Sequence, residues 1–182
     1  MGTKGYFGFY FKGRLYIVFH QCDSFPRHLG NDLLNELKEM MKEKKLKEWK
    51  DKFEELQILY LDHDEDFDKL TTEDHSFLIQ HFHNDFFEKI QYPFTKDHSL
   101  FTFDNLYWLY LYNSSFTKIL DSGFILIHSD VEKTIYDAEY GYVLDFDNCK
   151  FIIRDYHRHN ELFFNLHELP KSLNFYDYLY ES

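Results

Sequence analysis

Runs of β-branched and aromatic residues lie near both ends of the chain, and the apolar residues between them take helical spacing. Near the N-terminus, β-branched and aromatic residues fill Tyr6 to Phe11 and Arg14 to His20. Lys12 and Gly13 separate these two runs, and glycine supplies the positive φ that a tight turn requires. The pattern predicts an N-terminal β-hairpin.

Four sets of apolar residues recur at intervals of three and four, the spacing typical of amphipathic helices. Asn31 precedes the first set as its expected N-cap, and Thr71 to Asp74 resembles a capping box before the third. Gly123 follows the fourth set, where a C-cap glycine is expected. The second set forms either a separate helix or a bent continuation of the first. The four sets are Leu33, Leu34, Leu37, Met40 and Met41; Leu46, Trp49, Phe53, Leu56 and Tyr60; Phe77, Leu78, His81, Phe82, Phe86 and Ile90; and Phe103, Leu106, Tyr107, Tyr110 and Leu111.

Strand-favouring runs return in the last third of the chain. They are Gly123 to His128, Tyr140 to Phe146, Lys150 to Tyr156 and a short edge strand at Leu162 to Leu166. Strands at both ends with helices between them predict an α+β fold. We expect an antiparallel sheet from the N-terminal hairpin and the C-terminal strands, packed by three to four central helices on one face. Residues 1–170 are expected to form one domain, followed by a C-terminal tail at 171–182.

The net charge and the number of cysteines limit which cellular compartment and which classes of partner we expect. The chain of 182 residues has a net charge of −12, which repels nucleic acid and anionic membranes. Its two cysteines, Cys22 and Cys149, are too few for a disulfide framework. Apolar runs such as Phe124 to Ile127 are far shorter than the roughly 20 residues of a membrane span. We therefore expect a soluble cytoplasmic protein without a membrane or nucleic-acid partner.

The aromatic content points to a protein partner. Phe, Tyr and Trp make up 21% of the chain, and Ala138 is the single alanine. This composition is typical of an AT-rich coding genome, as in some large DNA viruses or protists, so the expected location becomes the host cytoplasm or the virion if the protein is viral. Rings left at the surface indicate a contact with another molecule. The expected partner is a second copy in a homodimer, or another protein.

The candidate catalytic residues lie where the second predicted strand runs into a loop. His20, Asp23 and Ser24, with Cys22 among them, offer a base, a carboxylate and a nucleophile. Alternation along a strand places His20 and Cys22 on one face and Asp23 on the other. A buried thiol beside a strand-end histidine is the interpretation that this spacing favours. A hydrolase site built on His20, Asp23 and Ser24 remains the alternative.

Several patterns resemble metal sites but fail in detail. Asp62, Asp64, Asp66 and Asp68 have the spacing of a calcium-binding EF-hand loop, yet Phe67 stands where that loop needs glycine. His81 and His83 are two residues apart on a predicted helix, so they do not face one another. The alternating charges of Lys38 to Lys52 are typical of a solvated helix face. We expect neither a metal nor a cofactor.

Two stretches of the chain have a distinctive sequence: Met1-Gly2-Thr3-Lys4-Gly5 with Asp23-Ser24-Phe25-Pro26 and Leu29-Gly30, and the later Tyr140-Gly141-Tyr142-Val143-Leu144-Asp145-Phe146-Asp147. They resemble an uncharacterised protein family found in fungi, other eukaryotic microbes and large DNA viruses. Family members begin with a Gly-Thr-Arg-Gly-like segment and carry an Asp-Ser-Tyr-Pro-x-x-Leu-Gly-like motif. Lys4 replaces the arginine, and Phe19-His20 replaces Tyr-Asn. The resemblance implies membership but no activity, because the family has no assigned function.

Together these patterns predict a non-enzymatic interaction or structural protein, virion-associated if it is viral. The prediction depends on the expected surface rings and on the lack of a complete reactive group of side chains. The hydrolase at the end of the first hairpin is the competing hypothesis.

Overall fold

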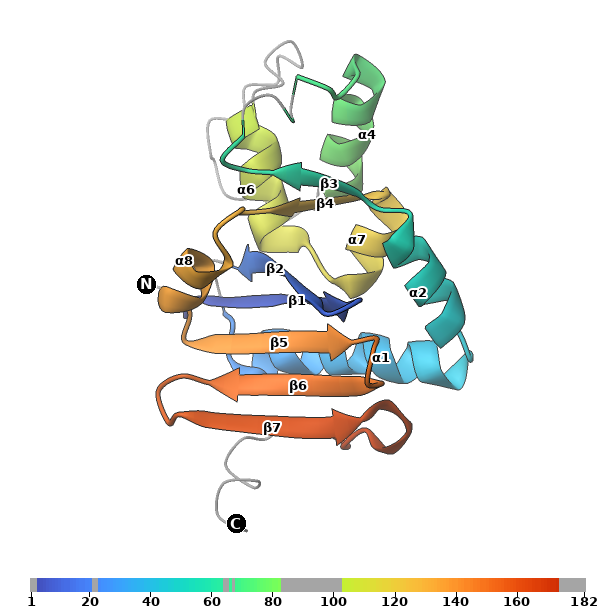
Figure 1. Cartoon of the computed structure of the whole chain (residues 1–182), viewed down its shortest axis with the longest axis vertical. Coiled ribbons are helices and arrows are strands. Elements are labelled where there is room, and N and C mark those ends of the chain that lie inside the picture. Colours follow the sequence, from blue (N-terminus) through green and yellow to red (C-terminus); the bar gives the residue numbers. More distant parts are fainter. Residues whose placement is uncertain (1–2, 21–22, 64–65, 67, 83–102, 174–182) are drawn as a thin grey trace.

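The main sheet has five strands in the spatial order β2-β1-β5-β6-β7 (Figure 1). It belongs to a computed structural model that describes residues 3–20, 23–63, 66, 68–82 and 103–173. The strands are β1 (Gly5–Phe11), β2 (Arg14–His20), β5 (Tyr140–Asp145), β6 (Lys150–Asp155) and β7 (Asn160–Asn165). The predicted α+β class is confirmed, with strands from both ends of the chain in one sheet.

The N-terminal hairpin is confirmed at its predicted turn. Lys12 and Gly13 have φ values of 50° and 75°, as two-residue hairpin turns require. Asp147, in the turn between β5 and β6 at the same end of the sheet, supports this turn, since its carboxylate accepts hydrogen bonds from the backbone N–H groups of Lys12 (2.9 Å) and Gly13 (2.8 Å). Two turns distant in sequence are thereby joined.

One strand pairing differs from the antiparallel sheet that we expected. β1 pairs with β2 antiparallel, as β5 does with β6 and β6 with β7, but β1 and β5 run parallel. Parallel neighbours need a long crossover connection, and more than a hundred residues separate these two strands. The sheet is therefore mixed.

Aromatic rings fill the space between the inner face of the sheet and the helices. α1 (Asn31–Lys42), α2 (Leu46–Glu54) and α7 (Phe116–Ser122) cover this face, and α1 runs behind β5 and β6 in Figure 1. Phe9 lies 4.7 Å from Phe53 and 5.1 Å from Phe116 between ring centroids. Rings from β1, α2 and α7 thus share one core, as expected for helices on one face.

A second, two-stranded sheet lies beyond the edge of the main one. β3 (Gln57–Tyr60) and β4 (Phe124–Ile127) pair in parallel, and α4 (Thr72–Phe82) and α6 (Phe103–Asn113) pack nearby (Figure 1). The predicted strand after Gly123 is thus β4, in this small sheet. The helical assignment of Tyr60 is wrong, because its segment pairs with β4 as a strand. Phe86 and Ile90, predicted to continue α4, lie outside the described residues.

Some helix ends match the predictions and others differ from them. Ser115 separates α6 from α7 by accepting a hydrogen bond from the Lys118 N–H, whereas the spacing predicted a continuous helix up to the C-cap. Gly123 is that C-cap, with φ of 76°. Thr71 and Asp74 form the predicted capping box, with reciprocal bonds of 2.9 and 3.1 Å. Asn31 is not an N-cap, because a π-helical turn, η1 (Pro26–Gly30), runs directly into α1.

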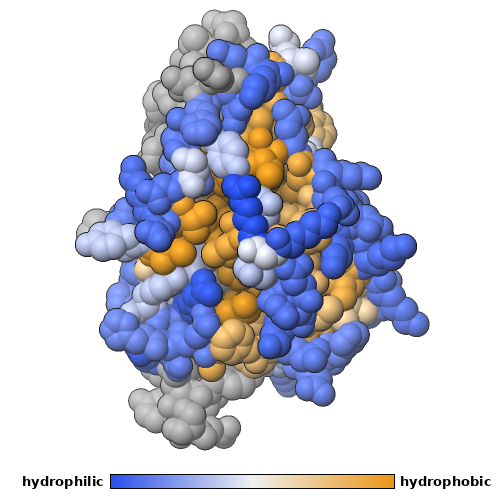
Figure 2. Space-filling view, in the orientation of Figure 1, coloured by the Kyte–Doolittle hydropathy of each residue, from blue (hydrophilic) through white to orange (hydrophobic). Residues whose placement is uncertain are grey.

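The opposite face of the main sheet has a smaller apolar cluster. α8 (Val131–Tyr136), which the pattern did not predict, covers part of it through Val131 and Ile135. Figure 2, drawn from the same side as Figure 1, shows hydrophobic surface over the middle of this face.

The start of the predicted C-terminal tail packs against α1. After η2 (Leu166–Glu168), the chain reaches Leu173, which is buried and donates its N–H to the Asn31 side chain at 2.7 Å. Residues 174–182 of that tail lie outside the described residues.

Candidate functional site

His20 and Ser24, two of the candidate catalytic residues, lie in contact. The Nδ1 atom of His20 is 3.1 Å from the Ser24 hydroxyl oxygen. Ser24 is 0% exposed, and His20 is buried at the end of β2. The pair has the spacing of a nucleophile and a base, but the hydroxyl is enclosed by protein.

Ser24 is surrounded by contacts that hold the fold together. Its N–H donates to the Thr3 carbonyl at 3.2 Å, and its carbonyl accepts the Tyr142 hydroxyl at 2.8 Å. A Cβ added at Gly5 would lie 2.6 Å from the Ser24 Cβ. Thr3, Gly5, Ser24 and Tyr142 therefore meet at one structural junction between β1, the turn after β2, and β5.

Asp23 is separated from this junction by its backbone conformation. It is exposed and has φ of 51°, a region in which Asp is tolerated better than most residues. Its carbonyl accepts the Leu29 N–H at 3.4 Å. Cys22 lies outside the described residues. The structure brings His20 and Ser24 together and shows neither side chain donating a hydrogen bond to the Asp23 carboxylate.

A groove of about 410 Å³ opens between α1, α2 and the start of α7. Its deeper residues are apolar: Trp49 is 6% exposed and Met40 is 2% exposed. Its rim is acidic along α1 and basic at one point on the opposite side. The lining residues are Asp32, Asn35, Glu36, Glu39, Met40, Glu43, Lys45, Trp49 and Thr117.

Four carboxylates form a stripe along α1. Asp32, Glu36 and Glu39 lie in α1 and Glu43 is its C-cap; spaced at four, three and four residues, they share one face. Glu43 pairs with Lys45 at 2.6 Å, and Glu39 with Lys42 at 3.6 Å. The stripe can be read from the sequence by this spacing, whereas the mixed charges of Lys38 to Lys52 alone predict only a solvated helix face.

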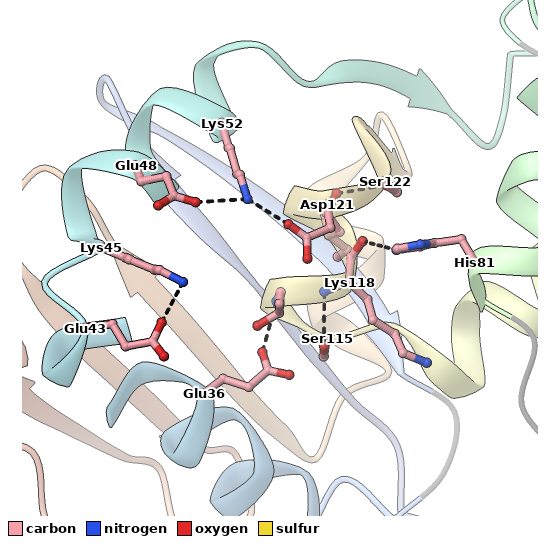
Figure 3. A network of polar contacts seen from close by, with 12 residues as sticks. Glu36, Glu43, Lys45, Glu48, Lys52, His81, Ser115, Lys118, Asp121 and Ser122 are labelled. Carbon is pink, nitrogen blue, oxygen red and sulfur yellow. Dashed lines mark hydrogen bonds and ion pairs between the residues drawn. The ribbon is translucent and has the colours of Figure 1, made fainter. Parts of the chain in front are cut away.

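Glu36 is the most enclosed carboxylate of the stripe. It reaches from α1 toward the N-terminal end of α7 (Figure 3), where it accepts the Thr117 N–H at 3.0 Å. Burial raises the pKa of Glu36, and hydrogen bonds from Ser115 and Thr117 oppose that shift. The groove thus holds a carboxylate whose charge is poorly solvated.

Lys52 of α2 and Lys45 at its N-cap are engaged in ion pairs. Lys52 bridges Glu48 at 3.2 Å and Asp121 of α7 at 2.8 Å (Figure 3). The lining of the groove has four carboxylates and one ammonium group, that of Lys45. Lys45 is already paired with Glu43. Within α7, burial lowers the pKa of Lys118 while the charge of Glu36 opposes the change.

The residues of the EF-hand-like pattern have separate structural roles. Asp62 accepts hydrogen bonds from the N–H and hydroxyl of Ser129, whereas Asp66 accepts the Tyr60 N–H at 3.0 Å and pairs with Lys69. Asp64 and His83 lie outside the described residues. Within the described ranges, no three His, Cys, Asp or Glu side chains are grouped as metal ligands would be.

Two findings bear on the wider identity of the chain. Among the described helices, none is long and apolar enough to cross a membrane. No protein-family model, curated protein or solved structure gives a significant match to this chain.

Proposed function

We propose that this protein is a non-enzymatic interaction module whose groove between α1 and α2 receives a basic segment of a partner protein. One observation carries the proposal: the carboxylate stripe of α1 borders a groove with Trp49 and Met40 at its base. An acidic rim around apolar residues matches the chemistry of Lys and Arg side chains, which combine an apolar stem with a cationic head.

The groove contacts would use both parts of such a side chain. The stem would lie along Met40 and Trp49, and an Arg head placed over the indole would gain a cation–π contact. Glu36 and Glu39 would accept charge-assisted hydrogen bonds from the guanidinium group. A bound cation would also offset the unfavourable burial of the Glu36 charge.

The charge of the whole chain supports a basic partner. A net charge of −12 attracts cationic segments and raises their rate of encounter. It also makes nucleic acid an unfavourable partner, so a protein segment is the occupant that we propose.

Tryptophan fluorescence of the full chain, titrated with acetylated hexa-arginine, tests the proposal. We expect a saturable change that Trp49→Phe removes, since Trp49 lines the groove. Hexa-citrulline, which keeps the shape but lacks the charge, should give no change. The double variant E36Q/E39Q should bind about tenfold more weakly, a loss of about 1.4 kcal/mol.

A matched pair of variants separates groove binding from general attraction to an acidic protein. E132Q/D137Q removes the same charge from exposed residues at α8, so its affinity should stay close to that of the unchanged chain. Equal weakening by both double variants would contradict the proposal, as would a fluorescence change that persists in Trp49→Phe.

We further propose that the protein acts in the cytoplasm, or in the host cytoplasm or virion if it is viral. The free thiol of Cys149 is compatible with a reducing compartment.

The hydrolase built on His20, Asp23 and Ser24 is a second candidate. The 3.1 Å contact between His20 and Ser24 favours it, whereas the full burial of Ser24 requires an opening before any substrate could reach the hydroxyl. Labelling with a fluorophosphonate probe at Ser24, abolished in Ser24→Ala, would support this candidate. A chain that stays unlabelled while folded would count against it.

A further inference from the structure

β7 forms one edge of the main sheet and has three consecutive apolar residues. Leu162 and Phe164 are half-buried on the inner face, while Phe163 is 55% exposed on the outer face. In the part of the chain that the structure describes, no strand pairs with the other side of β7. Native edge strands are commonly protected by charged side chains, Pro or a bulge. The regular strand Asn160–Asn165 has neither Pro nor a bulge, and Glu161 is its one charged residue.

The register of β6 and β7 identifies which backbone groups face outward. Leu166 donates its N–H to the Cys149 carbonyl at 3.0 Å, so these opposed residues form a hydrogen-bonded pair. Such pairs alternate along an antiparallel ladder. Phe164, Leu162 and Asn160 therefore bond to β6, and the N–H and C=O groups of Glu161, Phe163 and Asn165 point away from it.

We infer that two copies of this chain join through antiparallel pairing of β7 with β7, giving a continuous ten-stranded sheet. A two-fold axis at Phe163 pairs this residue with its counterpart. The same axis brings Glu161 of each copy opposite Asn165 of the other and Leu162 opposite Phe164. The three outward-facing residues then form the hydrogen-bonded pairs of the new ladder.

The charges that this register brings together are also compatible with pairing of the two strands. It sets Glu161 against the neutral Asn165, so no like charges lie directly opposite. Within each copy, Glu161 is already paired with Arg154, and the Lys150 ammonium lies 5.8 Å from the centroid of the Phe163 ring. Charges near β7 are thus locally balanced in a chain that is strongly acidic overall. The contact uses none of the groove residues.

Sedimentation velocity of the full chain, from about 1 to 100 µM, tests the inference. The unchanged chain should sediment at twice its mass of 22.4 kDa. Phe163→Pro removes an outward N–H without removing a bond to β6, and proline is tolerated on edge strands. This variant and Phe163→Lys should be monomeric over the whole range. Circular dichroism establishes that each is folded.

Phe77→Lys is the matched control, because Phe77 is 45% exposed but lies on α4. It should remain a dimer. A monomeric unchanged chain, or a dimer that persists in a folded Phe163 variant, overturns the inference.

A cross-link tests the register even if the proline variant does not fold. Directly opposed, hydrogen-bonded residues have Cα atoms about 5.5 Å apart, within the span of a disulfide. In a background with Cys22 and Cys149 changed to serine, Phe163→Cys should oxidise to a covalent dimer and Phe77→Cys should not. Failure of Phe163→Cys to cross-link would exclude the two-fold register.

Discussion

Tyr142 donates its hydroxyl hydrogen to the carbonyl oxygen of Ser24 across 2.8 Å. Both residues are 0% exposed, so the bond joins β5 to the turn after β2 without competition from water. Burial also raises the pKa of Tyr142 well above its ordinary value, so the hydroxyl is a donor at neutral pH.

Tyr142→Phe should destabilise the protein by about 1–3 kcal/mol, because it leaves the buried Ser24 carbonyl without its donor. Urea unfolding followed by circular dichroism measures the loss. Tyr136→Phe is the control, since Tyr136 is 90% exposed and its change should alter the free energy of unfolding very little. Equal stability of the two variants would mean that the Ser24 carbonyl finds another donor.

Gly5→Ala should destabilise the same junction by overpacking, at about 1–3 kcal/mol. The new methyl group would lie 2.6 Å from the Cβ of the fully buried Ser24 and 2.8 Å from the Tyr140 carbonyl oxygen of β5. Gly13→Ala meets no atom within 4 Å but has φ of 75°, so its cost should be smaller, about 1 kcal/mol. Thermal unfolding of both variants compares the two effects. A larger loss for Gly13→Ala would contradict this account.

Local patterns predicted most elements because neighbouring residues determine them. The hairpin at Lys12-Gly13, the capping box at Thr71 and the C-cap at Gly123 each depend on a few adjacent residues, and all three are confirmed. Tyr60 shows the opposite case. Its spacing fits a helix, but β3 gains its backbone partners from β4, more than sixty residues later. The parallel direction of β1 and β5 is likewise a property of the crossover and not of either strand.

The site could be predicted only in part for the same reason. The carboxylate stripe from Asp32 to Glu43 is readable from spacing, but the groove exists because Trp49 and Thr117 reach it from two other helices. His20 and Ser24 are four residues apart, so their proximity was foreseeable. The enclosure of Ser24 by Gly5 and Tyr142 depends on strands at opposite ends of the chain. The catalytic role of His20, Asp23 and Ser24 stays a prediction.

Asp147→Asn should weaken the link between the two hairpin turns in a pH-dependent way. Hydrogen bonds from Gly13 and Lys12 lower the pKa of Asp147. A lowered carboxyl pKa contributes stability above the ordinary value near 3.8 that is lost as pH falls through the folded-state value. The unchanged chain should therefore have the higher Tm at pH 7, with the difference shrinking below about pH 4. Asp137→Asn, at an exposed residue after α8, should give no such trend. A difference that is constant with pH would rule out the carboxylate as its cause.

Glu36→Gln should raise the stability of the fold at neutral pH, the opposite of Asp147→Asn. The same variant tests whether Glu36 contributes to binding or to stability. Burial raises the pKa of Glu36, so its contribution to stability is fully present below the ordinary value of 4.5 and is lost as pH rises through the folded-state pKa. Glutamine removes the buried charge while its carbonyl oxygen can still accept the Thr117 N–H. The variant should therefore have a higher free energy of unfolding than the unchanged chain at pH 7, measured in urea. Its advantage should decline on acidification, when Glu36 itself becomes neutral. Glu39→Gln, at an exposed position on the same helix face, should change the free energy of unfolding very little at either pH.

Proteins often retain a destabilising group where it serves binding. A Glu36→Gln chain that is more stable yet binds hexa-arginine more weakly would show that this carboxylate serves binding in the groove and not stability of the fold. Lower stability of the variant at pH 7 would instead show that the hydrogen bonds from Ser115 and Thr117 outweigh the cost of burying the charge.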